Sequence, residues 1–170
     1  MLLPTVSPYV SGEISVFEKL VQAGEAESFV TLPYPIHLFL VGVLVDHLYD
    51  VKLFRESVAL NLMNATTKMR ENGREQANEL LMRAGDEGLL IAGLFPETAR
   101  RLNVSPSYFR FMGQAAYASL SARHIVTGAN QGSFFDTVAE AFPVLEKVLK
   151  ATRSNPEEEA KLNAFLRSIP

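Results

Sequence analysis

The chain has 170 residues, of which 48% are apolar and 21% charged, and it contains neither Cys nor Trp. This length and apolar content predict one globular domain and argue against a disordered chain. The lack of Cys excludes disulfides and thiolate metal sites. A formal net charge of −3 argues against a basic, nucleic-acid-binding surface.

Neither the N-terminal residues nor the longest apolar stretch indicates a membrane role. Met1–Val10 has no basic residue and is interrupted by two prolines, unlike a signal peptide. Ile36–Val45 is shorter than the about 20 apolar residues that a bilayer span requires. We therefore expect a cytoplasmic protein with no membrane partner and no nucleic-acid partner.

The first residues of the chain predict an arm followed by two helices. We expect an irregular N-terminal arm over residues 1–11 and a helix over residues 12–23, ended by Gly24. Pro35 is well placed as the first residue of a second helix, which extends to Tyr49 and is apolar on nearly every face.

The middle of the chain predicts two further helices and a short helical turn. Asp50 is expected to cap the third helix, and Asn72-Gly73 to end it. The fourth helix begins near Arg74 with charged residues and becomes wholly apolar over residues 88–95. A turn of helix over residues 96–101 follows.

The last part of the chain predicts up to three more helices. Ser105-Pro106 marks the start of a fifth helix that ends near Arg123, because Ser caps a helix and Pro suits its first position. Ser133 marks the start of a sixth, kinked at Pro143, and Asn155-Pro156 that of a seventh. The sixth helix has apolar residues at heptad spacing: Phe135, Val138, Phe142, Leu145 and Leu149.

These elements predict an all-α fold, a compact single-domain bundle of six or seven helices over residues 1–170. The apolar segments at residues 35–49 and 88–95 are expected to form a buried central pair or an interface.

Asp86 is the most unusual residue, because it is a carboxylate inside an apolar stretch of predicted helix. A buried carboxylate without a partner costs several kcal/mol or has a raised pKa. Its partner is either Arg83, one turn earlier, or a residue of the fifth helix: Tyr108, Arg110 or Tyr117. Asp86 is then either a structural tie or an acid/base or ligand-binding group in a pocket.

Other candidates for chemistry give weaker signals. Glu97 and His124 are possible catalytic groups, although neither belongs to a recognisable motif. His47 and Asp50 are weak metal-ligand candidates that would need further carboxylates such as Asp86 or Glu87. No phosphate loop or metal-binding motif is present, so we predict no cofactor and no metal.

Small residues are frequent in the fourth and fifth predicted helices. A helical Gly costs about 0.5–1 kcal/mol relative to Ala, so these positions need a reason. One reason is close helix–helix packing. The other is room for a flat or chain-like ligand between Gly88 and Gly113, with Tyr108 and Tyr117 as further ligand-binding residues.

Residues 85–117 also resemble a pattern found in a group of uncharacterised bacterial all-helical proteins. The residues that carry the resemblance are Gly85-Asp86, Gly93-Leu94-Phe95-Pro96-Glu97, Arg100-Arg101, Tyr108-Phe109, Gly113 and Ala116-Tyr117. The resemblance implies a bacterial, cytoplasmic source, and it places Asp86 and the two tyrosines in one structural unit. The group has no established activity, so the resemblance implies none.

Three functions fit the sequence. The first is a non-enzymatic protein-interaction or scaffold module that self-associates as a homodimer, which would use the surplus of apolar helix faces. The second is a protein that binds a small molecule or an acyl chain in an apolar pocket. The third is an enzyme with Asp86 as its acid/base.

Overall fold

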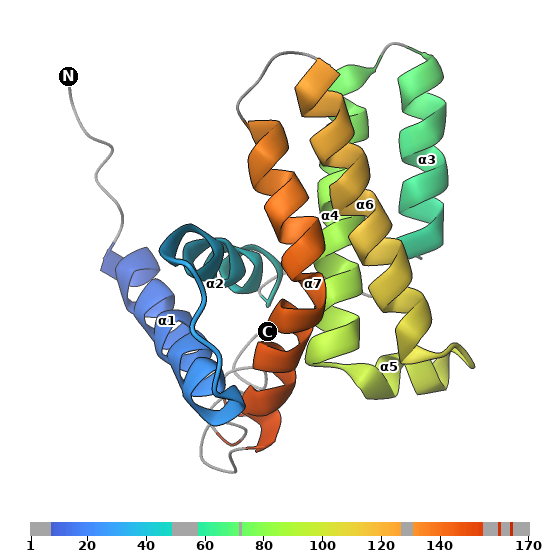
Figure 1. The fold of residues 1–170 in the computed structure, drawn as a ribbon. Helices are drawn as coiled ribbons and strands as arrows, with labels where there is room; N and C mark the ends of the chain where they lie inside the picture. The colour runs from blue at the N-terminus through green and yellow to red at the C-terminus, as the bar shows by residue number, and fades with distance from the viewer. Residues whose placement is uncertain are drawn as a thin grey trace, which may run out of the picture.

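A computed structural model of the chain describes residues 8–48, 58–71, 73–126 and 131–154, together with residues 160 and 164. Within these ranges it contains helices and no strand, which confirms the predicted all-α bundle of six or seven helices. The helices are α1 Pro8–Ser28, α2 Tyr34–Leu48, α3 Val58–Arg70, α4 Arg74–Gly93, α5 Pro96–Arg101, α6 Pro106–Val126 and α7 Gln131–Ser154 (Figure 1).

Helix α4 is the central element of the bundle. It packs along α6 and α3 and also contacts α7 and α5, while α1 and α2 pack against each other and α1 lies along α7 (Figure 1). Both apolar segments predicted to be central are largely buried. They do not lie along one another, because α6 occupies the long face of α4 and α2 contacts α4 only slightly.

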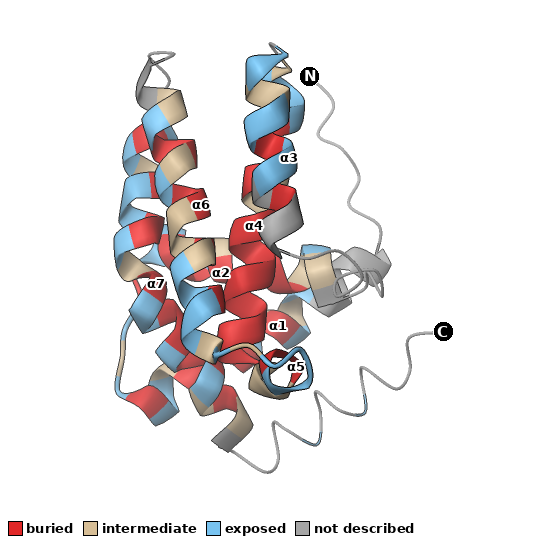
Figure 2. Cartoon of the chain, turned by 90° about the vertical axis from the view of Figure 1, so that its right-hand side faces the viewer, coloured by how far each residue is buried: buried red, intermediate tan, exposed pale blue. Residues whose placement is uncertain are grey.

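The second half of α4 is buried without interruption from Ala84 to Gly93 (Figure 2). The heptad-spaced residues of α7 are buried against it and its neighbours, all of them within the same chain. That stripe therefore forms the core of the monomer and is not available as a dimer interface. In the described part of the chain, no helix has both the length and the apolar character needed to cross a bilayer.

Glycines allow α4 and α6 to touch through their backbones. A Cβ on Gly88 would lie 2.8 Å from Gly113 Cα and 2.9 Å from the Phe109 carbonyl oxygen. A Cβ on Gly113 would lie 2.8 Å from the ring of Phe142. These positions are thus occupied by protein atoms, and the space between Gly88 and Gly113 leaves no room for a ligand.

Helix α1 differs from its predicted limits at both ends. It begins at Pro8, so residues 8–11 are helical, while residues 1–7 lie outside the described residues. Gly24 lies inside the helix, where it permits close contact with α7. A Cβ at this position would lie 2.5 Å from the Val148 carbonyl oxygen. The helix ends at Ser28, and the next residue, Phe29, adopts a left-handed φ of 54°.

The other helices begin and end within a few residues of their predicted limits, where those limits lie in the described residues. Ser105 Oγ accepts a hydrogen bond from the Ser107 amide at 3.3 Å, as a capping side chain does at the start of α6. Helix α7 begins at Gln131, so the predicted cap Ser133 lies inside it, and the helix continues through Pro143. Asp50 and Asn155-Pro156 lie outside the described residues.

We predict that Gly88→Ala lowers the free energy of unfolding by about 1–3 kcal/mol, because its Cβ would meet backbone atoms that cannot move aside. Gly42→Ala is the matched control, since a Cβ there meets no atom within 4 Å in the described part of the chain. Gly42→Ala should raise the free energy of unfolding by about 0.5–1 kcal/mol. Urea unfolding of both variants measures the difference, and equal effects would contradict the proposed helix contact.

Candidate functional site

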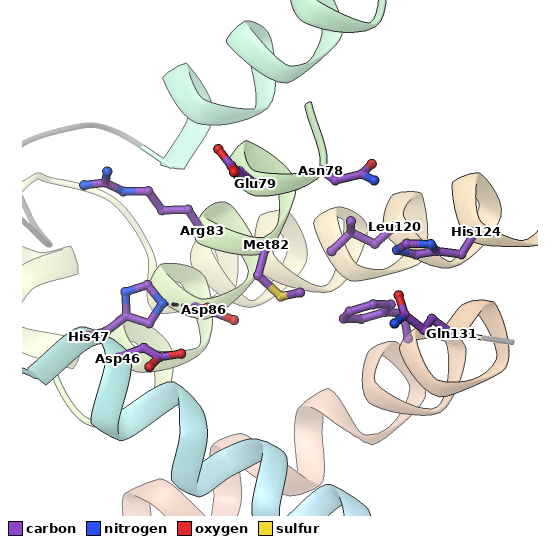
Figure 3. A pocket seen from close by; sticks show the side chains of 11 residues that line it. Asp46, His47, Asn78, Glu79, Met82, Arg83, Asp86, Leu120, His124 and Gln131 are labelled. Atoms are coloured by element: carbon purple, nitrogen blue, oxygen red, sulfur yellow. Dashed lines mark hydrogen bonds and ion pairs between the residues drawn. The ribbon is translucent and has the colours of Figure 1, made fainter. Parts of the chain in front are cut away.

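The Asp86 carboxylate is buried in α4, with 5% of the residue exposed, and both of its oxygens are hydrogen-bonded. The Tyr117 hydroxyl of α6 donates to Oδ1 at 2.6 Å. His47 Nε2, at the C-terminal end of α2, lies 2.6 Å from Oδ2 (Figure 3). The structure therefore brings Asp86 and Tyr117 together, and it adds His47 as the second partner.

Local structure explains how this cluster forms. A Cβ on Gly85 would lie 2.4 Å from the Tyr117 ring, so the glycine before Asp86 makes room for the tyrosine that holds it. His47 occupies the last turn of α2, where the helix dipole favours a positive charge. Three helices, α2, α4 and α6, thus meet at one carboxylate.

The charges in this cluster shift the pKa of each member. Burial raises the pKa of Asp86, and the hydrogen bonds from His47 and Tyr117 offset only part of this rise. Burial acts to lower the pKa of His47, but the hydrogen bond and the charge of Asp86 outweigh it, so the His47 pKa lies above its ordinary value. Burial and Asp86 raise the pKa of Tyr117, which keeps its hydroxyl protonated as a donor.

Arg83, the local partner considered for Asp86, instead pairs with the next residue along α4. Its Nε donates to Glu87 Oε1 at 2.9 Å. Asn61 of α3 donates to Glu87 Oε2 at 3.2 Å, and Glu87 is buried. Successive carboxylates on α4 therefore face different neighbours, one toward α2 and α6 and the other toward α3.

A pocket of about 450 Å³ opens beside the Asp86 cluster. It lies between the C-terminal end of α2, the middle of α4, the C-terminal half of α6 and the start of α7 (Figure 3). The residues that line it are Asp46, His47, Asn78, Glu79, Met82, Arg83, Asp86, Leu120, His124, Gln131 and Phe135. The lining combines charged groups near α2 with apolar and amide side chains toward α6 and α7.

The amide of Asn78 has a fixed orientation in this wall. Arg123 Nε donates to Asn78 Oδ1 at 2.6 Å, so the oxygen is engaged and the amide nitrogen remains as a donor. His124 stacks on Phe135 with ring centroids 5.5 Å apart and an interplanar angle of 13°. His124 and Gln131 lie at the end of the pocket that is farthest from His47 (Figure 3).

The other predicted site residues lie away from the pocket. Glu97, in α5, accepts a hydrogen bond from Arg153 of α7 at 2.9 Å. Tyr108 packs edge-on against Phe109 near the start of α6, and Gly113 lies at the crossing of α4 and α6. None of these three is part of the pocket lining.

Metal binding finds no support in the described ranges. They hold no group of three or more His, Asp, Glu or Cys residues placed to bind a metal ion. His47 uses Nε2 to contact Asp86, and its other predicted partner, Asp50, lies outside those ranges.

Sequence reasoning missed His47 as the hydrogen-bond partner of Asp86, and it did not single out Asn78 or Gln131. His47 is 39 residues from Asp86, so helical spacing could not pair them. One signal could have found the pair: His47 and Asp86 are ionisable residues on two apolar helices, and buried groups of opposite charge favour contact with each other.

Comparison with known protein families, with curated proteins and with solved structures finds no match for the chain. The site is therefore interpreted from its own geometry.

We predict that the His47–Asp86 contact weakens as the pH rises. The folded protein holds the His47 proton more tightly than the unfolded chain. The contribution of this contact to the free energy of unfolding is therefore complete below about pH 6.5, and it is lost at higher pH as His47 deprotonates in the folded protein. The raised pKa of Asp86 also makes stability fall with rising pH, over a lower pH range, because the buried carboxyl group becomes charged.

Urea unfolding of the wild type and of His47→Gln, from about pH 6 to pH 9, measures this contribution as a difference. The stability advantage of the wild type should shrink as the pH rises. An advantage that grows over this range would contradict the assignment, as would a His47 imidazole that titrates by NMR below its ordinary pKa.

Proposed function

We propose that the chain binds a small organic molecule in the pocket beside Asp86. The observation that carries this proposal is the buried Asp86 carboxylate, which accepts a hydrogen bond from Tyr117 at Oδ1 and fixes His47 in the pocket wall through Oδ2. A volume of about 450 Å³ falls in the range of small-molecule sites.

The lining supports the same conclusion. Small-molecule sites combine an apolar surface with a few polar groups in fixed orientations. Here Met82, Leu120 and Phe135 supply the apolar surface. His47, held by Asp86, and the amide nitrogen of Asn78, oriented by Arg123, supply polar groups whose positions do not depend on the ligand.

Asp86 acts as a positioning residue in this proposal. Both of its oxygens are engaged by protein donors, so it does not present a free oxygen to the pocket. Acid–base chemistry, the alternative in which Asp86 is catalytic, would therefore have to pass through His47, the member of the pair that is more exposed.

We predict that Met82→Trp fills the pocket and weakens ligand binding by about tenfold or more. Ligand-observed NMR with a library of small organic molecules first identifies binders of the wild-type chain. Met63→Trp is the matched control, because Met63 is 67% exposed on α3 and does not line the pocket.

The chain has no natural Trp, so each variant also carries a single fluorescent reporter for the same titration. Binders should be lost in Met82→Trp and kept in Met63→Trp. A library that yields no binder, or binders that both variants retain equally, would contradict the proposed function. Circular dichroism of both variants checks that the helices are intact.

A second candidate function is self-association through α2. Tyr34 and Leu38 are 69% and 44% exposed, and with Gly42 they share one face of this apolar helix. A glycine with open space beside it, on an exposed apolar face, would allow a second copy of the chain to approach closely.

We predict that light scattering detects a dimer of the wild-type chain at micromolar concentrations and a monomer of Leu38→Glu, because the new charge would be buried in the contact. Met63→Glu, at a more exposed apolar position on α3, serves as the control and should still dimerise. A wild-type chain that is monomeric at every concentration removes this candidate.

A further inference from the structure

Building on the proposed binding function, we propose that the ligand of the pocket beside Asp86 is an organic cation, an ammonium group attached to an apolar body. The groups that would attract its charge are Asp46 of α2 and Glu79 of α4, which lie on opposite sides of the pocket (Figure 3), and the apolar wall would hold its body.

The basic groups on the α2 side of the pocket are already paired with buried carboxylates. His47 contacts Asp86 at 2.6 Å, and Arg83 contacts Glu87 at 2.9 Å. An anionic ligand would have to compete with these carboxylates at each cation, in surroundings where a buried charge left without its partner is costly. The pocket is therefore a poor site for an anion.

The acidic groups at the pocket surface are not paired in this way. Asp46 and Glu79 are exposed, and neither makes an ion pair or a hydrogen bond with any other described residue. They come from two different helices and flank the pocket (Figure 3). Once the His47–Asp86 and Arg83–Glu87 pairs have cancelled, the remaining charge of the pocket is negative, which attracts a cation.

The rest of the wall determines what kind of cation fits. A bare metal ion is disfavoured, because the described residues hold no cluster of three or more His, Asp, Glu or Cys ligands. Met82, Leu120 and Phe135 instead contribute an apolar surface to the wall of the same pocket. Thioether and aromatic side chains favour an apolar or aromatic body that carries the positive charge at its end.

The test compares three probes of similar shape and different charge: phenethylamine, which is a cation at neutral pH, phenethyl alcohol and phenylacetate. Their dissociation constants are measured by NMR titration of the full chain at low ionic strength, where charge effects are least screened. Phenethylamine should bind about tenfold more tightly than phenylacetate, with the alcohol between them, and should shift signals of the pocket residues.

The double variant Asp46→Asn/Glu79→Gln should remove the preference for the cation while it leaves binding of the alcohol unchanged. The matched control is Glu27→Gln/Glu140→Gln, which removes the same number of charges from exposed positions outside the pocket. This control should retain the preference, which separates a local effect from the net charge of the chain.

Three outcomes overturn the inference, and each is distinguishable from failure of the binding function. If phenylacetate or the alcohol binds the wild type as tightly as phenethylamine, or if the pocket variant keeps the preference, the ligand is not selected by Asp46 and Glu79. If none of the probes binds while the library yields uncharged or anionic binders that Met82→Trp loses, the inference fails alone. If no binder is sensitive to Met82→Trp, the binding function itself fails.

Discussion

The Asp86 carboxylate is the constraint on which the arrangement of α2, α4 and α6 depends. A buried carboxylate is stable only when its oxygens are hydrogen-bonded, and here one partner comes from α2 and the other from α6. Helix α6 would remain on α4 without this bond, because the two helices pack along their length. Helix α2 contacts α4 only slightly, and the His47–Asp86 contact ties its C-terminal end to that helix.

The glycine before Asp86 belongs to the same constraint. Tyr117 reaches Oδ1 only because its ring occupies the space where a side chain at position 85 would be. Gly88 and Gly113 then bring the two backbones into contact one turn further on. The cost of helical glycine is thus offset by close packing, and that packing places the tyrosine hydroxyl at the buried carboxylate.

The sequence predicted the helices well and their partners poorly, for a physical reason. Helical spacing and caps depend on neighbouring residues, so the fold class and the start of α6 followed from local patterns. Periodicity shows which face of a helix is buried and not what covers it. For this reason Gly24 was interpreted as a helix end although it contacts α7. Tyr117 was only one of four partners considered for Asp86, and His47 was not among them.

The position of the pocket follows from the change in character along α4. Its first half is partly exposed and polar, its second half is wholly buried, and Asp86 lies where the two meet. Further toward Gly93 every residue of α4 is buried, and further toward Arg74 many of its residues are exposed. At this transition α2, α6 and α7 leave a recess with both apolar and charged walls. Because His47 forms part of that wall, a ligand that contacts it also contributes to holding α2 against α4.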